Sequence, residues 1–237
     1  MEALDLGVEQ FSFTGGEPFV VRDFVAILQL ALEHRPCLVL TNGTEPLFNR
    51  MDEVRALLDT PNDIRFRISI DYADEKRHDS GRGPGNFKRS LEMIRALGKK
   101  GFAVSVARQR ETCEDIEAAD RAFREVLVEN GITNDIPIVS FPDFFLPNTD
   151  GNAPVITEDC MTTYHNEEGR AQFMCAYSKM VVKKNGRVGV YACTLVDDDP
   201  DYDLGESLTE SMKARVMLRH HRCYSCFACG ASCSEQG

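Results

Sequence analysis

Seven of the nine cysteines lie in the last third of this 237-residue chain. They are Cys160, Cys175, Cys193, Cys223, Cys226, Cys229 and Cys233. In a reducing compartment, thiols clustered in this way favour metal thiolates over disulfides. Sites of four thiolates bind zinc as readily as iron–sulfur clusters, so the cysteines alone are compatible with either a zinc site or an iron–sulfur cluster. The other two, Cys37 and Cys113, are scattered in the first half and are interpreted as structural thiols.

The spacing of these cysteines predicts a common site. Residues 180–191 form two alternating runs around Asn185-Gly186, which is a strong signal for a tight hairpin. Such a hairpin brings its flanks together, so Cys175 and Cys193 can approach one site. We expect a helix over 204–221, followed by a knuckle at 223–233 that supplies the remaining thiolates.

A second candidate for ligand chemistry is Phe-Ser-Phe-Thr-Gly-Gly-Glu-Pro, at residues 11–18. It predicts a short strand entering a turn, where Gly15 and Gly16 expose backbone groups with no Cβ in the way of a ligand. Glu17 places a carboxylate at the mouth of the turn, able to take an ammonium group, and Pro18 fixes φ where a helix begins.

These residues must be positioned by an alternation of strands and helices. After the first strand, apolar strands are expected at 38–41, 65–71, 102–107 and 136–141. Amphipathic helices are expected between the strands: at 20–33, at 46–58, in a segment that ends at Lys100, and at 114–130. Strand–helix alternation with short polar turns predicts a parallel sheet with ligand groups gathered at the carboxyl ends of its strands.

This order of turns resembles the radical S-adenosylmethionine (SAM) superfamily, and within it the subgroup with a cysteine-rich C-terminal extension of the SPASM or twitch kind. The resemblance implies an α/β fold: a partial (β/α)6 barrel over 1–150, then a small cysteine-rich α+β domain over 151–237. It also implies an enzyme in which a reduced cluster splits SAM to a 5′-deoxyadenosyl radical, which abstracts hydrogen from a substrate.

The resemblance assigns roles to residues of this chain. Gly15, Gly16, Glu17 and Pro18 would hold the methionine end of SAM, with Glu17 facing the amino group. Ser69 and Asp71 would reach the ribose, and Arg82 is a candidate for the SAM carboxylate. His78-Asp79 would lie in a loop that shapes the pocket. The seven clustered cysteines would hold one or two auxiliary [4Fe–4S] clusters. Expected partners are a peptide or small-molecule substrate and a reductant such as flavodoxin or ferredoxin.

The sequence departs from the family in two places. The C-x3-C-x2-C motif that binds the SAM-cleaving cluster should precede the Gly-Gly-Glu-Pro strand, but the first cysteine, Cys37, follows it. A misplaced start, a missing N-terminus and a truncated homologue that has lost the chemistry would each explain this. The alternative function is therefore a non-catalytic iron–sulfur or zinc-binding protein. The last cysteine run is also shorter than usual, with two residues between its second and third cysteines.

Composition narrows the class of protein. With 38 acidic and 27 basic side chains the formal charge is −11, which disfavours a nucleic-acid partner. No apolar run approaches the ~20 residues that a membrane helix needs, and the N-terminus lacks the pattern of a signal peptide. We therefore expect a cytoplasmic protein with no membrane partner.

Overall fold

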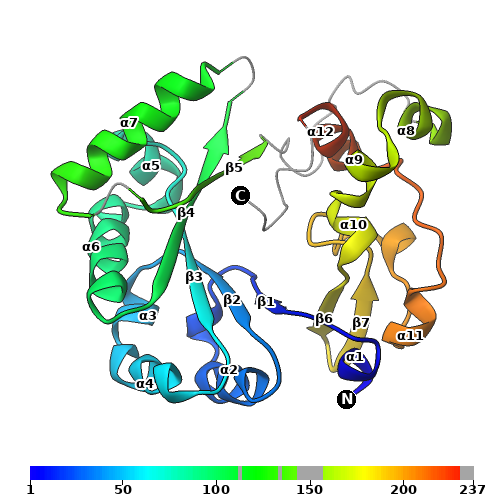
Figure 1. The fold of residues 1–237 in the computed structure, drawn as a ribbon, viewed down its shortest axis with the longest axis horizontal. Helices are drawn as coiled ribbons and strands as arrows, with labels where there is room; N and C mark the ends of the chain where they lie inside the picture. Colours follow the sequence, from blue (N-terminus) through cyan, green and yellow to red (C-terminus); the bar gives the residue numbers. More distant parts are fainter. Residues whose placement is uncertain (112–113, 133–134, 143–156, 230–237) are drawn as a thin grey trace. The chain divides into compact units, whose positions relative to one another are not determined.

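The computed structural model describes residues 1–111, 114–132, 135–142 and 157–229. The chain forms two compact units (Figure 1). We call Gly7–Phe141 the sheet unit, and Met1–Leu6 together with Pro142–Gly237 the hairpin unit. The predicted domain boundary after residue 150 lies outside the described residues. Among those described, no helix has the length and apolar character needed to span a membrane.

All five predicted strands of the sheet unit are present. They are β1 (Phe11–Phe13), β2 (Cys37–Thr41), β3 (Ile64–Ser69), β4 (Ala103–Arg110) and β5 (Ile138–Pro142). They follow one another across the sheet in sequence order, and the β1/β2, β2/β3 and β3/β4 pairs are parallel. The mixed α/β fold with a five-stranded sheet confirms the predicted fold class and is consistent with the expected partial barrel.

The helices of the sheet unit cover one face of the sheet. They include α2 (Phe24–Leu32), α3 (Glu45–Phe48), α4 (Met51–Arg55), α5 (Glu75–Arg82), α6 (Asn86–Lys99) and α7 (Ile116–Glu129), with 3₁₀ turns η1 (Pro18–Val20) and η2 (Ala56–Asp59). Leu28 of α2 and Ile94 of α6 pack in one core with Phe66 and Ile68 of β3. Because side chains alternate along a strand, Arg67 and Ser69 of β3 point to the opposite face of the sheet from Phe66 and Ile68.

Two predicted helices of this unit are interrupted. The expected helix 20–33 is η1 followed by α2, because Val21 adopts an extended conformation (ψ 121°) between them. The expected helix 46–58 is divided into α3, α4 and η2. In both segments the buried apolar side chains keep their contact with the sheet although the helix is broken.

The hairpin unit contains the predicted β-hairpin. Its elements are α1 (Glu2–Asp5), α8 (Glu158–Tyr164), α9 (Glu167–Ala171), α10 (Met174–Tyr177), β6 (Met180–Lys184), β7 (Arg187–Tyr191), η3 (Pro200–Tyr202), α11 (Leu208–Ser211) and α12 (His221–Cys229). Strands β6 and β7 are antiparallel, and the turn residues Asn185 and Gly186 have φ of 53° and 83°. The hairpin prediction is confirmed.

The predicted helix over 204–221 is wrong. Only Leu208–Ser211 is helical, and the chain then runs without helix to residue 220. Val216 and Leu218, two residues apart as in extended chain, both line a cavity, and the backbone N–H groups of Arg219 and His220 donate to the Tyr202 hydroxyl. Tertiary packing here outweighs the local helical tendency. The expected knuckle is likewise replaced up to Cys229 by helix α12.

The N-terminal helix α1 belongs to the hairpin unit. The Glu2 carboxylate accepts hydrogen bonds from the Ser207 hydroxyl (2.8 Å) and from the Thr209 N–H (2.7 Å), at the start of α11. These bonds lower the pKa of Glu2 to about 2. The first six residues therefore contact a segment more than two hundred positions away in the sequence.

Candidate functional site

The turn after β1 is fixed by the carboxylate of Glu17. One oxygen accepts the N–H of Phe19 at 3.1 Å, which caps η1, and the other accepts the N–H of Asn42 at 2.8 Å. The Thr41 hydroxyl lies 2.8 Å from both oxygens. Glu17 therefore joins the turn after β1 to the end of β2.

A chain of polar contacts continues from this turn to the end of β3. The Asn42 side-chain amide donates to the carbonyl oxygen of Gly16 at 3.3 Å, and its oxygen accepts from Arg82. The Arg82 guanidinium binds both oxygens of Asp71, at 2.6 and 2.7 Å. A bidentate arginine–carboxylate pair fixes both distance and orientation. Three loops at the carboxyl ends of neighbouring strands thus meet in one network, which we call the edge network.

Asp71 is also held through its backbone. Its N–H donates to Nδ1 of His78, a side chain only 1% exposed. Burial lowers the pKa of His78, so the imidazole is neutral and able to accept this bond. The predicted loop at His78-Asp79 is wrong, because both residues lie in α5, whose first turn is capped by Asp74 through the N–H of Arg77.

The two glycines of the turn leave space beside their backbone. A Cβ built at Gly15 or at Gly16 would meet no atom within 4 Å. Gly15 has a φ of +149°, whereas Gly16 has a backbone conformation open to other residues. The space beside Gly16 is therefore accessible to a ligand, and it can be filled by substitution without backbone strain.

Six of the seven predicted SAM-site residues gather at this edge of the sheet. Gly15, Gly16, Glu17 and Pro18 form the β1 turn, and Asp71 and Arg82 form the ion pair. The seventh, Ser69, is the last residue of β3 and lies two positions before Asp71. Thr41 and Asn42 also belong to this network, and the polar turn that ends β2 was the only signal for them in the sequence.

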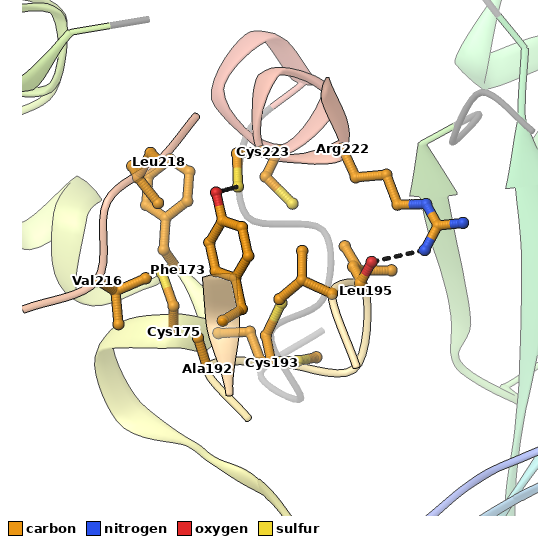
Figure 2. Close-up of a pocket in the computed structure, with 13 residues that line it drawn as sticks. Phe173, Cys175, Ala192, Cys193, Leu195, Val216, Leu218, Arg222 and Cys223 are labelled. Atoms are coloured by element: carbon orange, nitrogen blue, oxygen red, sulfur yellow. Dashed lines mark hydrogen bonds between the residues drawn. The ribbon is translucent and has the colours of Figure 1, made fainter. Parts of the chain in front are cut away.

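Four of the seven clustered cysteines line one cavity of the hairpin unit (Figure 2). Cys175 lies in α10 and Cys193 follows β7, so the hairpin brings them together as predicted. Cys223 and Cys226 enter from α12. The apolar wall of the cavity is built by Phe173, Ala192, Leu195, Val196, Val216 and Leu218.

Burial and mutual proximity act together on these thiols. The pKa of Cys175 is raised to about 11, first by burial and then by the charges that Cys223 and Cys226 would carry as thiolates. The pKa of Cys193 is raised to about 12, and that of Cys223 is also raised, again mainly by burial. In the described part of the chain, no three Cys, His, Asp or Glu side chains converge closely enough to hold one metal ion between them.

The remaining predicted metal ligands are not brought to this cavity by the described structure. Cys160 lies in α8, where its sulfur is 3.6 Å from the Thr157 hydroxyl oxygen. Cys233 and the side chain of Cys229 lie outside the described residues, as does Cys113. Cys37 is fully buried at the start of β2, which agrees with the interpretation as a structural thiol.

The chain was compared with known protein families and with curated proteins. No curated protein matches it significantly. The family model of the radical SAM superfamily matches residues 1–109, which include strands β1 to β3, almost all of β4, and every member of the edge network. Members of this superfamily use SAM together with a [4Fe–4S] cluster. Residues 1–109 of this chain are therefore similar to the radical SAM superfamily.

Proposed function

We propose that the edge network binds SAM, that the cysteine cavity holds an auxiliary [4Fe–4S] cluster, and that both serve a radical SAM reaction on a peptide or small-molecule substrate. The observation that carries the proposal is the joining of Gly16, Asn42, Arg82 and Asp71 at the carboxyl ends of parallel strands. Ligands of open α/β sheets bind outside this edge.

The edge network keeps hydrogen-bonding capacity for a ligand. A carboxylate offers about four lone-pair positions and a guanidinium five N–H donors. Arg82 uses three of its nitrogens on Asp71 and Asn42, and each terminal nitrogen retains a second N–H toward a SAM carboxylate. Asp71 retains lone pairs for ribose hydroxyls, and Glu17 can attract an ammonium group while it caps η1. Gly15 and Gly16 admit the methionine backbone.

The family's SAM-cleaving cluster does not fit the residues of the matched region. Between residues 1 and 109 the only cysteine is Cys37. Its side chain is buried, donates to the Arg35 carbonyl oxygen, and has a pKa raised by burial to about 12. The printed sequence holds no C-x3-C-x2-C motif. We therefore derive no step through that cluster.

The cysteine cavity does fit a cluster bound by thiolates. Four cysteine sulfurs line one space whose walls are mostly apolar, and four is the number of thiolates that a [4Fe–4S] centre takes from a protein. When bound, such a cluster would accept or deliver single electrons. The chain's own contribution is to orient the four sulfurs and to surround them with apolar side chains.

The SAM proposal is tested by a valine at Gly16. A branched side chain there fills the space that the ligand needs, but meets no protein atom at its Cβ. We expect Gly16→Val to lower the affinity for SAM by about tenfold or more, roughly 1.4 kcal/mol, in isothermal calorimetry. The unfolding midpoint should stay close to that of the wild type.

Gly98→Val is the matched control, because Gly98 also has open space at its Cβ and no positive φ, but lies in α6 away from the edge network. It should bind SAM as the wild type does. Equal affinity in Gly16→Val and wild type, or no binding by the folded wild-type chain, would contradict the assignment.

A further inference from the structure

Tyr202 places a phenol against the cysteine cavity. It lies at the end of η3, is 4% exposed, and belongs to the small core of the hairpin unit. Its oxygen lies 3.9 Å from the sulfur of Cys223, within the range of a hydrogen bond to sulfur. The same oxygen accepts the backbone N–H groups of Arg219 at 3.1 Å and His220 at 2.8 Å.

These contacts fix the direction of the bond to sulfur. A phenol offers one O–H donor and two acceptor positions. Arg219 and His220 occupy both acceptor positions, because a backbone N–H can only donate. The hydroxyl then has only its O–H proton left for a further hydrogen bond, and the sulfur of Cys223 lies within reach as the acceptor. Tyr202 therefore donates to Cys223.

We propose that Tyr202 donates its O–H to the Cys223 thiolate of the bound cluster and so raises the cluster's reduction potential. The inference rests on the proposed function of the cavity. Reduction makes a cluster more negative, so a donor aimed at a ligand sulfur stabilises the reduced form more than the oxidised form. Inside apolar walls such a bond is stronger than in water.

The position of Tyr202 suits this positioning role. The residue holds the two peptide groups that lead into α12, the helix that carries Cys223 and Cys226. Its ring packs against the imidazole of His220, with ring centroids 5.9 Å apart. The phenol is thus held by the same segment that presents the sulfur, and the distance between them is set within one short stretch of chain.

The test measures the potential of the cluster in the full chain. Tyr202→Phe keeps the ring and removes only the hydroxyl. After anaerobic reconstitution, we expect unchanged iron and acid-labile sulfide per chain and a lower midpoint potential in a redox titration followed by electron paramagnetic resonance. Tyr191→Phe, at the end of β7 and two residues before Cys193, is the matched control and should leave the potential unchanged.

A second variant covers the case in which Tyr202→Phe loses the cluster because the start of α12 loosens. Replacing Tyr202 by 3-fluorotyrosine keeps the donor and both acceptor positions but makes the O–H a stronger donor, so the midpoint potential should rise. An unchanged potential in both variants, or a shift of the same sign in both, would overturn the inference.

The wild-type chain distinguishes this failure from failure of the proposed function. If the wild type binds no iron and sulfide, the cluster proposal itself is wrong, and the role of Tyr202 falls with it. If the wild type holds a cluster whose potential does not respond to position 202, only the role of Tyr202 is wrong.

Discussion

At the scale of single residues, Glu17 has a structural role beside the ligand-binding role that we propose for it. Its carboxylate accepts hydrogen bonds from Phe19, Thr41 and Asn42, so the β1 turn is positioned before any ligand arrives. A preorganised site loses less conformational entropy on binding than one that must be ordered by its ligand. The cost is that an incoming ammonium group must share the carboxylate with these donors.

His78 performs a comparable task for Asp71. Its Nδ1 accepts the Asp71 N–H only while the ring is neutral. The charged groups around it are Asp71 and Asp79, which favour the protonated ring, and Arg82, which opposes it. Burial is the largest influence and lowers the pKa of His78 below its ordinary value of 6.5.

The pH dependence follows from this shift. The folded state binds fewer protons at His78 than the unfolded state, so its contribution to stability is complete above about pH 6.5 and declines as the pH falls toward the lower folded pKa. We expect hydrogen-exchange protection of the Asp71 amide to fall between about pH 7 and pH 5, measured by mass spectrometry and corrected for intrinsic exchange.

His78→Asn is the control for this prediction. Its side-chain oxygen can accept the same N–H and does not titrate in this range. Protection in the variant should be flat over the same interval. An equally steep decline in His78→Asn would show that another group controls the opening of this loop.

At the scale of elements, the hairpin determines which cysteines meet. The left-handed conformations of Asn185 and Gly186 return β7 antiparallel to β6, and this places Cys193 beside Cys175 of α10. Helix α12 then supplies Cys223 and Cys226 to the same cavity. Three separate elements build one set of thiols.

This arrangement predicts the metal content. We expect the anaerobically reconstituted chain to bind iron and sulfide and to absorb at about 400 nm, as [4Fe–4S] centres do. The double substitution Cys175→Ala and Cys193→Ala removes two of the four sulfurs and should lose most of the iron. Elemental analysis and acid-labile sulfide provide the measurement.

Cys37→Ala is the control, since Cys37 is buried in the sheet unit and lines no part of the cavity. It should retain the iron of the wild type. Stoichiometric zinc without sulfide after anaerobic purification would favour the alternative of a zinc site and refute the cluster.

At the scale of the whole molecule, the proposed SAM site and the thiols belong to different units. The edge network lies in the sheet unit and the cysteine cavity in the hairpin unit. A cluster whose four irons are each bound by a protein thiolate has no open iron to take the amine and carboxylate of SAM. The cavity therefore suits electron transfer better than SAM cleavage.

It follows that the 237-residue chain should not cleave SAM by itself. We expect no 5′-deoxyadenosine above background when the reconstituted chain is incubated with SAM and dithionite, measured by chromatography. A version of the protein extended by a C-x3-C-x2-C loop encoded upstream, where the gene provides one, should produce it. Turnover by the 237-residue chain would show that its own thiols hold a reactive cluster.

The sequence by itself determined the features that depend on local patterns. Short apolar runs predicted all five strands of the sheet unit, and Asn185-Gly186 predicted the hairpin. The Gly-Gly-Glu-Pro turn pointed to the superfamily that the family comparison found. Such features are readable because strand periodicity and positive φ are set by neighbouring residues.

The tertiary structure decided which distant groups meet. The pairing of Arg82 with Asp71 and Asn42 uses residues up to forty positions apart, and no local pattern encodes it. The segment 212–220 reads as helix in sequence, but it is not helical, because Val216 and Leu218 line the cavity and the Tyr202 hydroxyl accepts the N–H groups of Arg219 and His220. Burial and long-range hydrogen bonds outweigh a local propensity worth less than ~1 kcal/mol per residue, and they exist only once the chain is folded.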